Sequence, residues 1–136
     1  MNSNFVFHHL GIATKSIEKC VSIYNKLGYH NSDIKVEPSQ NVKICFLSKE
    51  GSPILELVEP LNNDAPVSSI IKNSGTTPYH TCYEVENLQN SLDELEDSGF
   101  RLLFEPLKTE AMDAGLFCYL FSAEIGLIEL YQKKKV

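Results

Sequence analysis

Apolar positions along the chain follow first the two-residue period of a strand and then the spacing of a helix. Phe5 to Thr14 is rich in residues that favour strands. Ser16 can cap a following helix whose apolar positions, from Ile17 onward, recur at helical spacing until Gly28 ends it. This opening stretch therefore predicts a strand followed by a helix.

Shorter apolar runs follow this helix and complete the first half of the chain. A polar segment at 31–40 predicts an edge strand and a loop, and the apolar runs at 41–48 and 53–59 predict two strands around a turn at 49–52. The first half thus has the order strand, helix, then three strands.

The second half has the same order after a connection that contains a short predicted helix at 66–73. A strand begins at Tyr79, a helix covers about 87–98 and ends at Gly99, and three strands follow at about 101–105, 116–122 and 127–132. The intervening segment 110–115 is predicted to be a mobile loop.

An internal repeat relates the two halves. His80 follows His9 by 71 residues, and the same offset places 16–29 over 87–100 without a gap, with Gly28 over Gly99. A repeat of this length indicates two copies of one structural unit. We therefore expect residues 1–136 to form a single domain of the α+β class, built from modules at about 5–60 and 79–132.

Composition narrows the class of protein. The chain has 136 residues, 43% hydrophobic and 22% charged, with a net charge of −6, which argues against nucleic-acid or anionic-membrane partners. It lacks a long apolar run and a signal-type start, so the expected location is cytoplasmic. The four scattered cysteines are expected to be small buried hydrophobic residues in a reducing compartment.

Two glutamates occur inside apolar strands, one in each half. Glu56 lies in ILELV and Glu129 in LIELY, 47 residues after His9 and 49 after His80. A single glutamate of this kind more often makes a salt bridge or blocks edge aggregation, and a single strand histidine is more often structural. The repeated spacing instead predicts two histidines and two glutamates that converge on one point.

Strand alternation separates the two adjacent histidines of the first strand. His8 shares a face with Leu10 and Ile12, which are expected to pack on the helix, whereas His9 shares the other face with small residues. His9 is therefore the better ligand candidate, and His8 is expected to be a partly buried packing residue.

Two imidazoles and two carboxylates form a mixed nitrogen and oxygen donor set. Such a set suits one divalent ion, with Zn, Ni, Co, Mn and Fe(II) as candidates. It would leave up to two positions of an octahedron free for a bidentate oxygen ligand.

Four short motifs make the chain resemble a known superfamily. HHLGIA, LELVEP, YHTCYEV and LIELYQ, spread over about 5–132, look like the ligand-bearing strands of the vicinal-oxygen-chelate (glyoxalase/bleomycin-resistance/dioxygenase) superfamily. The resemblance implies two βαβββ modules whose eight strands form a cleft around one metal. It also implies the ligands His9, Glu56, His80 and Glu129, and a homodimer.

Two groups within that superfamily are similar to different parts of the chain. The stretch 56–67, running on to His80, resembles methylmalonyl-CoA epimerase, whereas the ligand set resembles glyoxalase I. Ser39 stands where the epimerase pattern has a proton-transferring glutamate, with Glu37 and Gln40 beside it. Where glyoxalase I has an arginine and an asparagine that contact glutathione, this chain has Ala13 and Pro60.

The chemistry that both resemblances imply is removal of an α-proton from a metal-chelated, small-molecule carbonyl or thioester substrate by way of an enediolate. The resemblance to glyoxalase I implies that Glu129 or Glu56 acts as the base after letting go of the metal, and Glu129 is favoured because both groups have a glutamate there. The expected activity is that of a lyase or epimerase. The main alternative is a non-catalytic, drug-sequestering protein of the same fold; a ring-cleaving dioxygenase, a fosfomycin-type thiol transferase and a purely structural domain are less favoured.

Overall fold

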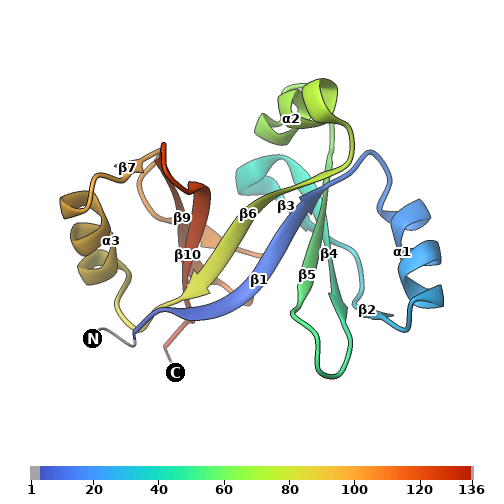
Figure 1. Ribbon diagram of the computed structural model, residues 1–136, viewed down its shortest axis with the longest axis horizontal. Coiled ribbons are helices and arrows are strands. Elements are labelled where there is room, and N and C mark those ends of the chain that lie inside the picture. The colour runs from blue at the N-terminus through green and yellow to red at the C-terminus, as the bar shows by residue number, and fades with distance from the viewer. Residues whose placement is uncertain (1–3, 136) are drawn as a thin grey trace. The chain divides into compact units, whose positions relative to one another are not determined.

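The computed structural model describes residues 4–135 of the chain, which form two compact units. The N-terminal unit is His9–Tyr79, and the C-terminal unit comprises the rest of the described chain, residues 4–8 and 80–135. Each unit contains a mixed β-sheet with a helix against one face, and Figure 1 shows these elements by label.

The N-terminal unit takes its sheet from the order β2-β4-β5-β1, with β3 paired to β4. β1 and β5 run parallel, and the other pairs are antiparallel. Its elements are β1 (Val6–Ala13), α1 (Ile17–Lys26), β2 (His30–Asn31), β3 (Lys35–Glu37), the 3-10 helix η1 (Pro38–Gln40), β4 (Val42–Ser48), β5 (Leu55–Pro60) and α2 (Pro66–Ser74).

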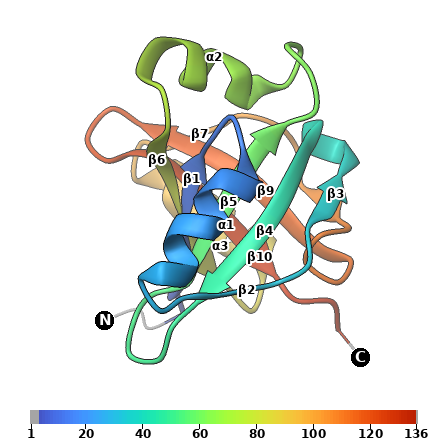
Figure 2. The same ribbon diagram turned by 90° about the vertical axis from the view of Figure 1, so that its right-hand side faces the viewer.

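A capping serine and a glycine with a positive φ mark the two ends of helix α1. Ser16 caps its start by accepting a hydrogen bond from the backbone N–H of Lys19, and Gly28 follows its end with φ of 95°, a conformation that side chains disfavour. Figure 2 shows the helix in front of β5 and beside β4. The core on this side is formed by Ile12, Ile17, Cys45, Leu47, Leu55 and Leu57.

The C-terminal unit repeats this arrangement. Its sheet has the order β6-β10-β9-β7, with β8 paired to β9 and with β6 parallel to β10. Its elements are β6 (Thr77–Glu84), α3 (Leu88–Asp97), β7 (Arg101–Leu102), β8 (Leu107–Thr109), β9 (Gly115–Ser122) and β10 (Gly126–Gln132).

Helix α3 covers one face of that sheet as α1 does in the other unit. Asn87 caps its start by accepting from the N–H of Asn90, and Gly99 follows its end with φ of 98°. The core between helix and sheet consists of Val85, Leu88, Leu92, Cys118, Leu120, Ile128 and Leu130.

The α+β class expected from the sequence is confirmed, and each half of the chain has a strand, a helix and then further strands. The structure differs from the predicted elements in the short strands at the edges of the sheets. The polar segment 31–40 forms two short strands and a 3-10 helix, and the strand expected at 101–105 covers only β7. β8 was not predicted, because its three residues carry no alternation long enough to recognise. The segment after it, 110–115, contains turns that lead into β9.

The cysteines match their predicted role in part. Cys45, Cys82 and Cys118 are buried, while Cys20 is partly exposed, and all four are free thiols. Burial, followed by the negative charge of Glu129, raises the pKa of Cys118 to about 12. None of the helices in the described residues is long and apolar enough to cross a membrane.

Removal of a buried leucine tests the core of the C-terminal unit. Leu130 is fully buried, so Leu130→Ala should lower the free energy of unfolding by about 2–5 kcal/mol, through lost burial and a residual cavity. The matched variant Leu103→Ala, at a position 46% exposed, should change it by only about 0.5 kcal/mol. Urea denaturation measures both, and equal losses would contradict this account of the core.

Candidate metal centre

The N-terminal unit brings His9 and Glu56 together on one face of its sheet. Gly11 lies directly beside Glu56 in the parallel register of β1 and β5, and His9, two residues earlier, shares that face. Nε2 of His9 lies 3.3 Å from Oε1 of Glu56, and both side chains are buried. The alternate residues of the same strands face α1, so the helix covers one side of the sheet and the donors occupy the other.

The C-terminal unit contains the same pair at the equivalent positions. Glu129 of β10 lies beside Cys82 of β6, and His80 shares the face of Cys82. Nε2 of His80 lies 3.1 Å from Oε1 of Glu129, again between buried side chains. Each pair of residues that the sequence spacing singled out is therefore in contact within its own unit.

An aromatic ring packs against each of these histidines. Phe46 lies opposite Glu56 in the ladder between β4 and β5, and its ring contacts that of His9 edge to face at 5.6 Å. Tyr119 holds the matching position opposite Glu129, and its ring contacts that of His80 at 5.3 Å. Packing of this kind fixes the ring plane of an imidazole, and hence the direction of its nitrogen lone pair.

The donor atoms of each pair fit a divalent ion. Two ligand atoms that each lie about 2.1 Å from one ion are about 3.2 Å apart when the angle between them is about 100°. The separations of 3.1 and 3.3 Å agree with this value. The residues His9, Glu56, His80 and Glu129 are all buried, and in each unit the imidazole and the carboxylate are donor types that suit a divalent ion.

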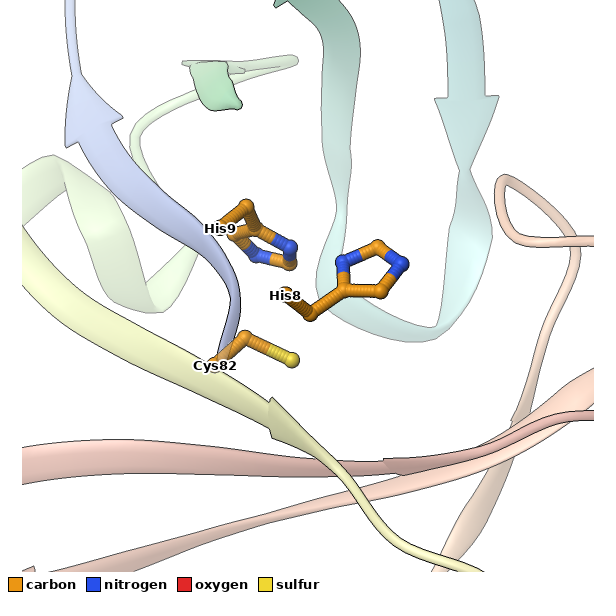
Figure 3. Close-up of side chains that lie close together, drawn as sticks. All are labelled: His8, His9 and Cys82. Carbon is orange, nitrogen blue, oxygen red and sulfur yellow. The ribbon is translucent and has the colours of Figure 1, made fainter. Parts of the chain in front are cut away.

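His8 has a different environment from that of His9, although the two are neighbours in β1 (Figure 3). His8 is partly exposed, and its ring packs against that of Tyr131 at a distance of 5.2 Å. One of its ring nitrogens lies within 4.8 Å of the sulfur of Cys82. The prediction that His8 is partly buried is confirmed, and its ring partner is Tyr131 of β10.

A further carboxylate in the N-terminal unit is buried. Glu37 is 2% exposed, and Oε2 of its carboxylate accepts a hydrogen bond of 2.9 Å from the hydroxyl of Ser39. Glu37 pairs with Val42, and by alternation along β4 and β5 it lies on the sheet face that carries Glu56. Ser39 itself is exposed, so the buried carboxylate stands two residues before the position that the motif alignment indicated.

Thr109 occupies the position in the C-terminal unit that matches Glu37. Each is the last residue of a three-residue strand paired to the following long strand, and Thr109 is 1% exposed. The sequence alone did not single out Thr109. The repeat offers one signal for it, since Thr109 lies 72 residues after Glu37, close to the offset that relates the two histidines.

Comparison with known families gives a match over most of the chain. The model of the glyoxalase/bleomycin resistance protein/dioxygenase superfamily matches residues 8–119. Mitochondrial methylmalonyl-CoA epimerase from Homo sapiens is 31% identical over 129 residues, which cover 92% of this chain and 72% of the relative.

Solved structures share the fold along nearly the whole chain. A hypothetical protein from Bacillus halodurans gives a TM-score of 0.87 at 28% identity, with 98% of each chain covered. Methylmalonyl-CoA epimerase from Streptomyces coelicolor, in complex with 2-nitronate-propionyl-CoA, gives 0.84 at 22% identity, covering 98% of this chain and all of that one.

A double-mutant cycle tests whether the buried pair in the C-terminal unit is strongly coupled. With His80→Ala and Glu129→Ala, measured by urea denaturation in EDTA, we expect a coupling energy of about 1.5–3 kcal/mol, because a buried contact to a charged group is poorly screened. The control is the ion pair of Glu84 and Lys133, which is partly exposed at 3.6 Å and should couple by less than about 1 kcal/mol. Equal coupling in both cycles would contradict this assignment.

Proposed function

The chain belongs to the glyoxalase/bleomycin resistance protein/dioxygenase superfamily, and on that premise we propose that it is a divalent-metal-dependent epimerase of acyl-CoA thioesters. The observation that carries the proposal is the histidine–glutamate pair that occurs once in each unit, with donor separations of 3.3 and 3.1 Å. A structural role would not require both units of a repeat to bury the same two donor types at equivalent positions.

One ion held jointly by both pairs is the simplest use of these donors. In this proposal, His9 and Glu56 supply half of the ligands, and His80 and Glu129 supply the other half. Two carboxylates balance the charge of a divalent ion, and neutral imidazoles complete the set without added charge. When bound, such an ion acts as a Lewis acid that stabilises the negative charge developing on a substrate carbonyl as its α-proton leaves.

Epimerisation needs proton carriers on both faces of the α-carbon. We assign removal of the proton to the carboxylate of Glu129, with Glu56 as the other candidate base. The C–H bond breaks, and its electron pair passes into the carbonyl system. Glu37 is the candidate for the second carrier, because it is a buried carboxylate and Ser39 donates a hydrogen bond to it. Return of a proton to the opposite face completes the inversion.

Support for an acyl-CoA substrate comes from the relatives and from this chain. The human relative is named a methylmalonyl-CoA epimerase, and the Streptomyces coelicolor epimerase is in complex with an acyl-CoA analogue. The positions that would contact glutathione in a glyoxalase I are Ala13, which is buried and apolar, and Pro60, which lacks a side-chain hydrogen-bonding group. These residues favour a CoA thioester over a glutathione adduct.

Metal stoichiometry tests the shared site. Elemental analysis after loading with Co²⁺ should give about one ion per chain, and His9→Ala or His80→Ala should each abolish nearly all of it, because either variant removes a ligand of the same ion. The exposed His30 supplies the control, since His30→Ala should leave the content unchanged. Two ions per chain in the wild type, with one lost in each variant, would mean separate ions, and no binding by the wild type would favour the alternative of a non-catalytic binding protein.

Isotope exchange tests the proton-transfer roles. In D₂O, the metal-loaded protein should incorporate deuterium at the α-carbon of methylmalonyl-CoA, and Glu129→Gln should slow this by about 10²–10⁴-fold, because the variant lacks the base. Glu37→Gln should still exchange the proton of one epimer but should not invert it. Mass spectrometry and a chiral assay measure the two outcomes.

Two control variants accompany the exchange experiment. Glu50→Gln, at an exposed turn, should behave as the wild type does. Glu56→Gln retains an oxygen ligand and should retain measurable exchange if Glu129 is the base. Wild-type exchange rates in Glu129→Gln, with the metal bound, would overturn that assignment.

A further inference from the structure

In the N-terminal unit, a glutamate three residues after the candidate ligand binds the start of α1. Oε1 of Glu59 accepts a hydrogen bond of 2.8 Å from the backbone N–H of Ile17, the first residue of the helix. Glu56 and Glu59 both belong to β5, and their odd spacing puts them on opposite faces of the sheet. The same strand therefore presents a donor on one face and holds the helix from the other.

The C-terminal unit contains an equivalent contact. Oε1 of Gln132 accepts a hydrogen bond of 2.7 Å from the backbone N–H of Leu88, the first residue of α3. Gln132 lies three residues after Glu129 in β10, as Glu59 lies three after Glu56 in β5. The two contacts occur at matching positions and are independent in sequence, so they represent a feature of the repeated unit.

A backbone hydrogen bond accompanies each of these side-chain contacts. The N–H of Thr14, next after β1, donates to the carbonyl of Val58 at 2.9 Å. The N–H of Val85, next after β6, donates to the carbonyl of Tyr131 at 2.8 Å. We call β1 and β6, which bear the candidate histidines, the histidine strands, and β5 and β10, which bear the candidate glutamates, the glutamate strands. In each unit, two neighbouring residues of the glutamate strand bind the end of the histidine strand and the start of the helix. A slip of one strand along the other would break both bonds.

Whether the side chain at each of these two positions is charged agrees with the residue opposite it in the neighbouring strand. Lys43 lies opposite Glu59 in the ladder, and its ammonium group is 3.1 Å from the Glu59 carboxylate. Leu116 lies opposite Gln132 at the matching place and offers no charge. A carboxylate occurs where a cation can pair with it, and a neutral amide occurs where none is opposite. What the two positions share is the acceptor oxygen directed at the helix.

We propose that Glu59 and Gln132 are positioning residues that set the register between the histidine strand and the glutamate strand of each candidate ligand pair. The inference rests on the proposed metal function. The N–H groups that these residues accept from are among those that a helix start leaves without intrahelical partners. Ser16 and Asn87 already serve other N–H groups of the same helix starts. The additional acceptors therefore tie the helices to the ligand strands, beyond simple capping.

Cobalt binding by substituted proteins tests this proposal. Glu59→Met and Gln132→Met keep the approximate size of each side chain and remove the acceptor oxygen. Each should raise the Kd of the full-length protein for Co²⁺ about tenfold and should alter the visible absorption of the bound ion, because residues that orient ligands tune both properties. Glu59→Gln and Gln132→Glu keep an acceptor oxygen, so the Co²⁺ spectrum of each should match that of the wild type.

Ser16→Ala is the matched control for general loosening of the helix. It removes the cap at the same helix start without touching β5, so it should lower the unfolding midpoint and leave the Co²⁺ spectrum and Kd unchanged. Wild-type spectra and affinities in both methionine variants would overturn the proposal, as would a change in Ser16→Ala equal to theirs. Failure of the wild type to bind Co²⁺ would instead overturn the proposed metal function and remove the premise.

Discussion

The constraint on which the structure depends is the burial of a histidine and a glutamate side by side in each unit. A carboxylate that is removed from water is costly unless a partner or an ion compensates it. Oε1 of Glu56 and of Glu129 lies 3.3 and 3.1 Å from an imidazole nitrogen, and a β-strand bears each donor. Strands hold side chains at fixed positions more firmly than loops do, which suits the ligand role proposed for these residues.

Because side chains alternate along the strands, each sheet has one apolar face that packs on a helix and one face that carries buried polar groups. In the N-terminal unit, one face carries Leu57 and Cys45 against α1, and the other carries His9, Glu56 and Glu37. Burial of the apolar face stabilises the fold, and this offsets the loss of stability caused by the polar groups buried on the opposite face. Glu59 and Gln132 link the two faces, because each belongs to a strand with a candidate ligand and accepts a hydrogen bond from the start of a helix.

The features that could be predicted from the sequence are those that depend on the internal repeat and on strand alternation. The offset of 71 residues pairs the two histidines, and the period of two residues separates His9 from His8. Glu37 was recognised only as a neighbour of an aligned position, because its burial depends on the pairing of β3 with β4. Thr109 was missed for the same reason, since a three-residue strand leaves no periodic pattern. Contacts such as that of Gln132 with Leu88 join residues 44 positions apart and cannot be derived from local pattern.

X-ray absorption spectroscopy of the cobalt-loaded protein tests most directly the proposal that both pairs hold one ion. The scattering from imidazole rings reports how many histidines bind each ion. A shared site predicts two imidazoles per ion with the remaining ligands oxygen, because His9 and His80 each supply one nitrogen. One imidazole per ion, with two ions per chain, would contradict the shared site and leave two separate half-sites.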